Sequence, residues 1–211
     1  MEAKTMFERA AEKFGDAVYD YKAAIAGPPD KTFKGFVNRD DEFKCKAEKF
    51  LELMQWLRSD PELDMDFLMC VTGVDYIKDK ILQSVYHLFS YRHRHTVCVK
   101  VDLPRDNPHV PSVVSIWKTA DWNEREQYDL LGIIYDGHPD LRRLLMPDDW
   151  VGHPMRKDYK EAETYRDMPT SRYSPLEMLS VYDKAHVTVS TDPNVPGGHK
   201  PAPPGAGEGD E

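Results

Sequence analysis

Apolar residues recur at intervals of three and four positions in two segments near the start of the chain, a pattern typical of amphipathic helices. The first helix is expected over Thr5–Phe14, where Gly15 can end it, and the second over Asp40–Leu57. Asp40 or Asp41 is expected to be the N-cap of the second helix, because an aspartate oxygen accepts hydrogen bonds from the first free N–H groups. The apolar stripes are Met6, Phe7, Ala10, Ala11 and Phe14 in the first helix, and Phe43, Ala47, Phe50, Leu51, Met54 and Leu57 in the second.

Three strand-like stretches follow, at Met65–Tyr76, Ile81–Ser90 and His95–Leu103. In the last of them, valines alternate with other residues, which is the pattern of a sheet with one buried face. The short connections at 77–80 and 91–94 are suited to hairpins, so the three strands should pair antiparallel.

Helical patterns return after the strands, at Ser112–Thr119 and Trp122–Leu131. Asp121 is a good N-cap for the second of these, and Glu124 stands three residues later, as in a capping box. Helices that flank a meander of strands predict an α+β fold, in which an antiparallel sheet carries helices packed on one face.

The chain loses its periodicity towards the C-terminus but keeps apolar side chains. Residues 147–182 contain repeated prolines together with Trp150, Met155, Tyr159, Tyr165, Met168, Tyr173, Met178 and Tyr182. Aromatic, methionine and arginine side chains are enriched at protein interfaces, so we expect an extended partner-binding arm over residues 147–190 after an α+β domain over 1–146. A loop packed on its own domain is the alternative. Residues 191–211 are rich in proline and glycine and lack aromatics, which predicts a disordered tail.

Composition narrows the functional classes. The chain has a net charge of −9 and pI ≈ 5.4, which disfavours nucleic acid as a partner. No apolar run approaches the ~20 residues that span a bilayer, and the first residues resemble neither a signal nor a transit peptide. The three cysteines are widely spaced and form no CxxC motif, which argues against disulfides and against an iron–sulfur or zinc site.

Histidines and charged residues offer few candidates for chemistry. His93 and His95 would face one side of a strand, but without a third ligand they make a weak metal site. Motifs for a nucleophilic serine, a P-loop or a dinucleotide are absent from the sequence.

Two charged clusters lie among apolar residues. The cluster Glu124-Arg125-Glu126 has two open interpretations: a solvated helix face with weak ion pairs, or a partly buried Arg125 bridged by carboxylates. Arg142 and Arg143 are adjacent in an apolar stretch, so their guanidinium groups must point to different sides. At least one of them is expected to reach an acidic or carbonyl-rich surface.

These clusters belong to a longer motif with fixed spacing. The motif comprises Glu124-Arg125-Glu126, Asp129-Leu130-Leu131, His138, Arg142 and Leu144-Leu145. It resembles the signature of the 30 kDa (C) subunit of respiratory complex I, the NADH–quinone oxidoreductase. The continuation DDWVGHPMRKDY, residues 148–159, is similar to the family's GHPLRKD motif, with Met155 where leucine is usual. Upstream, Gly73–Tyr76 also resembles the family.

The resemblance implies a non-catalytic structural subunit of the peripheral arm of a proton-translocating complex. It further implies that this chain binds no cofactor, while FMN, iron–sulfur clusters, NADH and quinone belong to the complex. The implied partners are the large 49 kDa (D) subunit and other peripheral-arm subunits, with indirect membrane association on the cytoplasmic side of the cell membrane. The residues that we expect to act in partner binding and assembly are Glu124, Arg125, Glu126, Asp129, His138, Arg142, Arg143, Trp150, His153, Arg156, Lys157, Asp158 and Tyr159.

Two alternatives remain open at this point. Membrane-bound hydrogenases and coenzyme F420 dehydrogenases contain similar subunits, and the electron donor depends on other chains. A more distant alternative is a stand-alone metal-dependent hydrolase that uses His93, His95 and His109.

Overall fold

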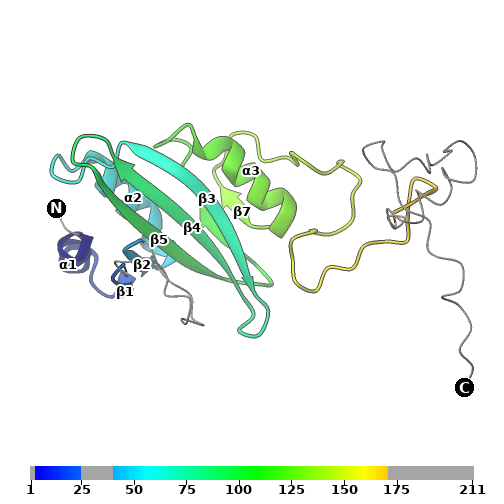
Figure 1. Ribbon diagram of the computed structural model, residues 1–211, viewed down its shortest axis with the longest axis horizontal. Coiled ribbons are helices and arrows are strands. Elements are labelled where there is room, and N and C mark those ends of the chain that lie inside the picture. The colour runs from blue at the N-terminus through cyan, green and yellow to red at the C-terminus, as the bar shows by residue number, and fades with distance from the viewer. Residues whose placement is uncertain (1–2, 25–39, 171–211) are drawn as a thin grey trace, which may run out of the picture. The chain divides into compact units, whose positions relative to one another are not determined.

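A five-stranded sheet lies at the centre of the fold. The structure is a computed structural model that describes residues 3–24 and 40–170 (Figure 1). The strands of the sheet are β1 (Val18–Lys22), β2 (Glu42–Cys45), β3 (Phe67–Tyr76), β4 (Ile81–Ser90) and β5 (His95–Pro104). The helices are α1 (Ala3–Phe14), α2 (Ala47–Ser59) and α3 (Ala120–Leu131), with a short 3-10 turn, η1 (Gly15–Ala17), after α1. The short strands β6 (His109–Pro111) and β7 (Ile134–Asp136) pair in parallel beside the main sheet.

The chain divides into two compact units, Met1–Lys160 and Glu161–Glu211. The first unit extends beyond residue 146, where we expected the α+β domain to end. Within the second unit, β8 (Thr164–Tyr165) and β9 (Met168–Pro169) form a small hairpin. The rest of the expected arm, from residue 171, and the expected tail at 191–211 lie outside the described residues.

The three predicted strands are confirmed as β3, β4 and β5, and both hairpins are antiparallel. The strand order is β1-β2-β5-β4-β3, so the third hairpin strand is central rather than at the edge. Because β2 pairs in parallel with β5, the sheet is mixed and not wholly antiparallel. The α+β class is confirmed.

The second predicted helix was wrong in its first part. Residues 42–45 form β2, in which Phe43 and Cys45 face the core while Glu42 lies opposite Cys98 of β5. Asp41 caps no helix; one of its carboxylate oxygens accepts hydrogen bonds from the Tyr21 hydroxyl and the Ala24 N–H. The helix begins at Ala47 without a side-chain cap.

One face of the sheet is covered by helices. Figure 1 shows α2 behind the central strands and α3 alongside β3. Phe50 of α2 packs against Tyr86 of β4, with ring centroids 4.7 Å apart, and both side chains are fully buried. Around them the core contains Met6, Phe43, Leu53, Met54, Leu57, Leu68, Leu82, Leu88, Val97, Val99 and Val101. Among the described residues, no helix is long and apolar enough to cross a membrane.

The expected helix at Ser112–Thr119 is a series of turns. The Ile116 and Trp117 N–H groups both bond to the Val113 carbonyl, and the Trp117 indole N–H reaches across to the Met65 carbonyl. This long-range bond directs the segment along β3 instead of into a helix. Helix α3 then begins at Ala120, so Asp121 lies in its first turn.

The predicted capping box was also wrong. The N-cap of α3 is Thr119, whose hydroxyl bonds to the Leu68 carbonyl of β3 instead of capping the helix. The Glu124 carboxylate binds Ser112 and the Val113 N–H, so it is held by the preceding segment rather than by the helix N-terminus.

Helix α3 packs along the edge of β3. The Gln127 side-chain amide accepts a bond from the Gly73 N–H and donates one to the Val71 carbonyl, as one residue of a neighbouring parallel strand would. A Cβ atom at Gly73 would lie 2.2 Å from Leu131 Cδ1 and 2.9 Å from Gln127 Oε1. Glycine at this position therefore permits the close approach of the helix.

Substituting Gly73 with alanine should lower the free energy of unfolding by ~1–3 kcal/mol, because α3 has to move away from β3 to admit the methyl group. Urea denaturation would measure the loss. Thr72→Val, at the adjacent exposed position, is the control and should change stability by less than ~0.5 kcal/mol. A Gly73→Ala protein with wild-type stability would contradict the proposed close packing.

Candidate functional site

The residues that carry the predicted site lie mainly on α3 and on the segment that follows β7. We call this segment, residues 137–160, the strap. The strap returns along α3, since the Met155 N–H bonds to the Leu130 carbonyl and Arg156 Nε bonds to the Leu131 carbonyl at 2.7 Å. Figure 1 shows the strap as the yellow-green chain beyond the end of β7.

Asp129 organises the first bend of the strap. One carboxylate oxygen accepts the N–H groups of Leu144, Leu145 and Met146 at 3.1, 2.7 and 2.8 Å. The other oxygen accepts a bond from Arg143 Nη1 at 2.8 Å. Burial acts to raise the pKa of Asp129, but these four donors outweigh it and hold the pKa below its ordinary value. The carboxylate therefore stays ionised and fixes the bend.

Arg125 fixes the same bend from the other side. Its guanidinium donates to the Arg142 and Arg143 carbonyls at 3.3 Å each and stacks over the Trp122 ring. Of the two interpretations for this cluster, the buried arginine is confirmed, but the groups that its guanidinium binds at this bend are carbonyls and not carboxylates. Glu126 is half-buried on the same helix.

The two adjacent arginines point to different sides, as predicted. Arg142 is exposed and pairs with Asp140 at 2.9 Å. Arg143 reaches the buried Asp129 carboxylate and also donates to the Gly152 carbonyl. The expectation that one of them meets an acidic or carbonyl-rich surface is therefore confirmed within the chain itself.

Glu124 of α3 and His138, near the start of the strap, have fully buried side chains. The Glu124 carboxylate accepts bonds from the Ser112 hydroxyl at 2.6 Å and the Val113 N–H at 2.9 Å. Burial raises the pKa of Glu124 to about 7, against an ordinary value of 4.5, although the two hydrogen bonds act to lower it. The His138 ring has no exposed surface and lies 4.0 Å from Glu124.

The GHPMRKD part of the strap closes over the C-terminal end of α3. Gly132 ends the helix with φ of 76°, and a Cβ there would lie 2.5 Å from His153 Nε2. The other ring nitrogen, His153 Nδ1, bonds to the Asp129 carbonyl at 2.9 Å. Burial lowers the pKa of His153, which keeps its ring neutral for this contact.

A second anchor joins the strap to the sheet. Arg105, just after β5, forms a two-pronged pair with Asp75 at the end of β3 and also binds Asp158 of the strap. The Lys157 N–H donates to Asp75 Oδ2 at 2.8 Å. Hydrogen bonds from Arg105 lower the pKa of Asp75, and bonds to Asp158 and Asp75 raise the pKa of Arg105. The sequence pattern did not single out Arg105 or Asp75 for this role, although Asp75 stands in the family-like stretch 73–76.

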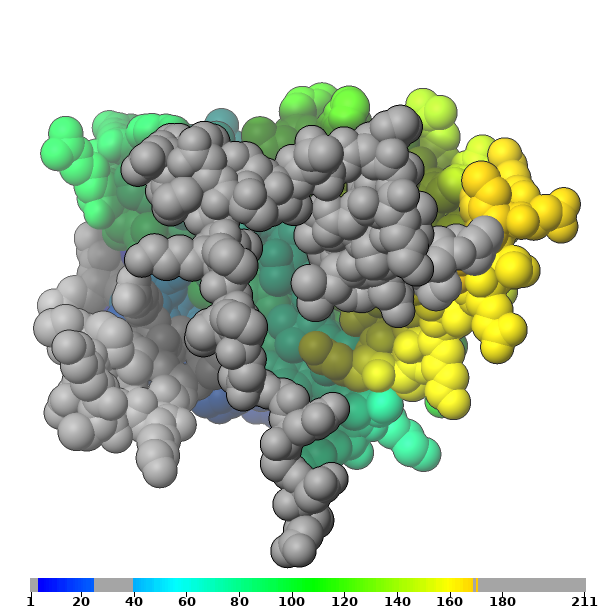
Figure 2. Space-filling view, turned by 45° about the vertical axis from the view of Figure 1, so that its right-hand side comes forward, coloured from blue at the N-terminus to red at the C-terminus, as the bar shows by residue number. Residues whose placement is uncertain are grey.

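The outer side of the strap and α3 carries apolar side chains. Trp122, Leu145, Val151 and Met155 expose 65%, 60%, 85% and 60% of their surface. Strap side chains, yellow-green to yellow in Figure 2, lie at the molecular surface. Trp150 turns inward along the strap, and its indole N–H donates to the Tyr159 hydroxyl at 3.1 Å. The polar signature residues thus hold the strap, while single large hydrophobic side chains face outward.

The candidate metal ligands do not assemble. His93 and His95 stack with ring centroids 5.5 Å apart, and their Nε2 atoms bond to the Pro61 and Leu63 carbonyls. His109 pairs with Asp136 instead. In residues 3–24 and 40–170, no three histidine, cysteine or acidic side chains form a group that could hold a metal ion.

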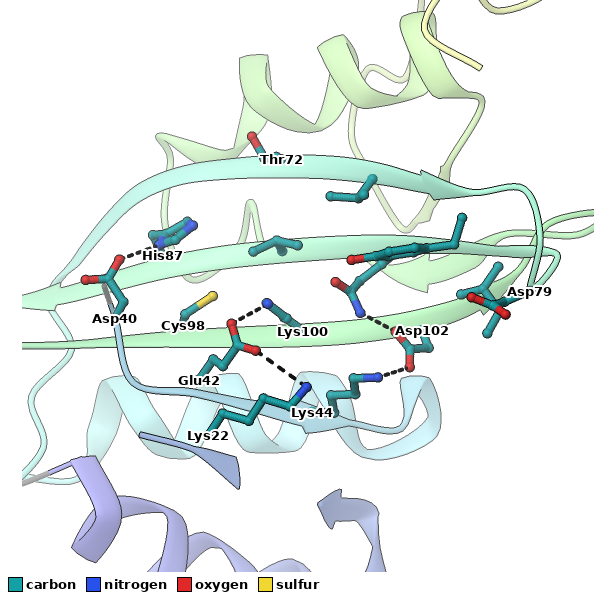
Figure 3. Close-up of a pocket in the computed structure, with 15 residues that line it drawn as sticks. Lys22, Asp40, Glu42, Lys44, Thr72, Asp79, His87, Cys98, Lys100 and Asp102 are labelled. Atoms are coloured by element: carbon teal, nitrogen blue, oxygen red, sulfur yellow. Dashed lines mark hydrogen bonds and ion pairs between the residues drawn. The ribbon is translucent and has the colours of Figure 1, made fainter. Parts of the chain in front are cut away.

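The face of the sheet opposite α2 contains a hollow of about 820 Å³ (Figure 3). Its charged side chains pair across neighbouring strands: Lys44 with Asp102 at 2.8 Å, and Lys100 with Glu42. Cys98 lies among them, and burial raises the pKa of its thiol to about 12, so it is a poor nucleophile. These pairs join β2 to β5, and we regard them as structural.

A known family model, the respiratory-chain NADH dehydrogenase 30 Kd subunit, matches residues 43–165. The C subunit of NADH-quinone oxidoreductase from Chlorobium phaeobacteroides is 39% identical over 165 residues, which cover 78% of this chain and 92% of that protein. The corresponding protein of Saccharopolyspora erythraea is 47% identical over 135 residues, covering 63% of this chain and 54% of that protein.

Two solved structures share the fold. The trypsin-resistant fragment (1–134) of Nqo5 matches with a TM-score of 0.53 and 26% identity, covering 67% of this chain and 100% of the fragment. A chain of the archaeal membrane-bound sulfane sulfur reductase matches with a TM-score of 0.58 and 22% identity, covering 76% of this chain and 86% of that one, which is evidence for the fold alone.

The matched family model describes a subunit of a respiratory-chain dehydrogenase, and the residues that it matches include α3 and the strap. The chain belongs to the family of the 30 kDa subunit of respiratory-chain NADH dehydrogenase. It spans a little more than half the length of the first curated relatives that it matches, with 54%, 59% and 60% of those proteins covered.

Proposed function

We propose that this chain is a non-redox structural subunit in the peripheral arm of a proton-translocating NADH–quinone oxidoreductase. Its family membership supports this role. In the proposal, FMN, the iron–sulfur clusters, NADH and quinone are bound by other subunits, and membrane association on the cytoplasmic side is indirect. Burial raises the pKa of the Cys45 and Cys98 thiols to about 12, so neither readily supplies the thiolate that an iron–sulfur cluster requires.

We further propose that the large 49 kDa (D) subunit docks on the outer surface of the strap and α3. The observation that carries this proposal is that polar and apolar side chains of the strap face different ways. Asp129, Arg143, His153 and Arg156 direct their hydrogen bonds within the chain, whereas the neighbouring apolar side chains point outward. Exposed tryptophan and other large apolar side chains on a rigid support are typical of the centre of an interface.

The signature residues would then act mainly as positioning residues for this surface. Arg125 shows how: it stacks on Trp122 and binds the carbonyls just before Leu144 and Leu145, so it sets the position of both surface elements. Lys157, Asp158 and the exposed Arg142 would contribute at the polar rim. The remaining part of the proposed arm, residues 161–190, would extend the contact.

Two substitutions test the docking surface. Trp122→Ala and Leu145→Ser should each weaken co-purification with the large subunit by roughly tenfold or more, because truncating a central interface side chain costs ~2 kcal/mol or more. Their thermal unfolding should stay close to wild type, since both side chains are mostly exposed.

Tyr19→Ala is the matched control, because Tyr19 is an exposed aromatic, with 36% of its surface accessible, on β1 at the opposite edge of the sheet from β3. It should leave co-purification unchanged. If both test variants assembled as well as wild type, the docking surface would have to lie elsewhere. If Tyr19→Ala alone blocked assembly, the β1 edge of the sheet would be the interface.

A further inference from the structure

The turn between β4 and β5 carries aromatic and cationic side chains that lie outside the docking surface proposed above. We call this turn, residues 91–95, together with the neighbouring Phe67 and Phe89, the hairpin tip. Figure 1 shows the turn at one end of the sheet, beside the connection between α2 and β3. The sequence of the turn is Tyr91-Arg92-His93-Arg94-His95.

Three aromatic rings form a platform at the hairpin tip. Phe67 and Phe89 lie opposite each other on β3 and β4, and both are half-buried. The Tyr91 ring meets Phe89 edge-on at a centroid distance of 5.1 Å and lies 5.5 Å from Phe67. Tyr91 nevertheless exposes 62% of its surface. The platform therefore offers apolar contact area at the surface of the molecule.

Two histidines hold the backbone of this turn in place. The carbonyl oxygens of Pro61 and Leu63 can only accept hydrogen bonds, so His93 Nε2 and His95 Nε2 donate to them, at 3.0 and 2.9 Å. The two imidazole rings stack with their planes 4° apart. A surface that is already fixed in position loses little freedom when a partner binds, which favours binding.

Arg92 and Arg94 supply two positive charges at the hairpin tip. Both side chains are exposed, and within residues 3–24 and 40–170 neither of them forms an ion pair. The carboxylates of the adjacent connection are engaged by other groups: Asp60 and Glu62 bind Arg9, Asp64 pairs with Arg58, and Asp66 accepts the Tyr91 N–H. In a chain with a net charge of −9, the two guanidinium groups remain available to an anionic partner.

We propose that the hairpin tip binds an acidic segment of a partner protein, which offers carboxylates to Arg92 and Arg94 and an apolar side chain to the platform at Tyr91. A guanidinium group can bind a carboxylate through two parallel hydrogen bonds. Tyrosine and arginine are also enriched among the residues that dominate the binding energy of interfaces. The contact is separate from the docking of the large subunit on the strap and α3, so either can hold without the other.

The surroundings of the hairpin tip favour a protein segment over an anionic membrane. The connection at residues 60–66 carries four carboxylates next to the arginines, and that of Glu62 is exposed. A flat anionic surface would have to approach these carboxylates together with the arginines, and the repulsion would offset the attraction. A narrow peptide segment can contact the arginines and leave the connection in water.

A synthetic peptide in which single leucines separate pairs of glutamates tests the proposal with the full chain. The fluorescence anisotropy of the labelled peptide should rise on titration with the protein, and added salt should weaken the binding. A peptide with lysines in place of the glutamates should not bind. Arg92→Glu combined with Arg94→Glu should weaken binding of the glutamate peptide by about tenfold or more, and Tyr91→Ala should also weaken it.

Lys78→Glu combined with Lys80→Glu is the matched control. These exposed lysines lie in the β3–β4 turn at the opposite end of the sheet (Figure 1), and the double substitution changes the net charge by the same amount. It should leave peptide binding unchanged. All of these side chains are exposed, so thermal unfolding of the variants should stay close to wild type.

The comparison of the two peptides needs no variant, so it stands even if a substitution disturbs folding. The absence of glutamate-peptide binding, equal binding of the lysine peptide, or an equal loss in both double variants would each overturn the proposal. Vesicles that contain phosphatidylserine provide the remaining arm. If the protein bound these vesicles through Arg92 and Arg94 and did not bind the peptide, the hairpin tip would be a membrane contact instead.

Discussion

Replacing Arg105 with alanine should lower the free energy of unfolding at neutral pH by ~3–5 kcal/mol, the usual cost of removing one partner of a buried ion pair. The Asp75 side chain is only 1% exposed, and Arg105 supplies two of its charge-assisted hydrogen bonds at 2.9 and 3.0 Å. Without Arg105 the Asp75 carboxylate keeps the Lys157 N–H as a donor but has no countercharge in this pair. Urea denaturation at pH 7 would measure the loss.

The pH dependence of this stability loss shows whether Arg105 acts through the ion pair or through packing. Because Arg105 lowers the pKa of Asp75, the stability from the pair is present above an unfolded-state value of about 3.8 and is lost as the pH falls through the lower folded value. The difference between wild type and Arg105→Ala should therefore shrink in acid. Asp75→Asn added to Arg105→Ala should recover part of the loss, and Arg92→Ala, on an exposed hairpin, should change little. A pH-independent difference would show that Arg105 acts through packing alone.

Replacing Asp129 with alanine should cost ~2–5 kcal/mol and should expose the strap to trypsin at Arg142, Arg143 and Arg156. The substitution removes the acceptor for three backbone N–H groups and one guanidinium. Denaturation would measure the stability and timed digestion would locate the cuts.

Asp129→Asn is the matched comparison for this site. Its carbonyl oxygen can still accept the N–H groups of Leu144, Leu145 and Met146, but the countercharge for Arg143 is lost. It should therefore lie between wild type and alanine in stability and in trypsin resistance. If asparagine and alanine were equally damaging, the charge would matter more than the backbone bonds. If alanine left the strap resistant, Asp129 would not organise it.

The central hairpins were predictable because their information is local. The alternating valines of β5 are typical of a strand and not of a helix, and short connections leave antiparallel pairing as the simple solution. The stretch 40–57 was ambiguous, since Phe43 and Cys45 suit either a helix stripe or an alternating strand. Its pairing with β5, more than fifty residues away, decides the outcome, and no local pattern reports such a partner.

In the candidate site, too, contacts between residues far apart in the sequence could not be predicted from local patterns. Because Arg142 and Arg143 are adjacent in an apolar stretch, the sequence indicated that their side chains point to opposite sides, and in the structure they do. The pair Arg105–Asp75 and the pair Arg105–Asp158 join residues 30 and 53 positions apart, so spacing could not reveal them. The burial of Glu124 could not be predicted for a different reason. Its position in the helix suggested a capping box, whereas its carboxylate accepts a hydrogen bond from the Ser112 hydroxyl in the preceding turn segment.

The contact between Gln127 and β3 has a consequence for copies of this chain that meet one another. An edge strand with free N–H and C=O groups is a template on which a second molecule can add its own strand, which starts aggregation. The amide of Gln127 occupies the Val71 carbonyl and the Gly73 N–H, and Thr119 occupies the Leu68 carbonyl. One helix thus blocks self-association at this edge with side chains alone, and the long strand β3 can stay at the border of the sheet without recruiting a neighbour.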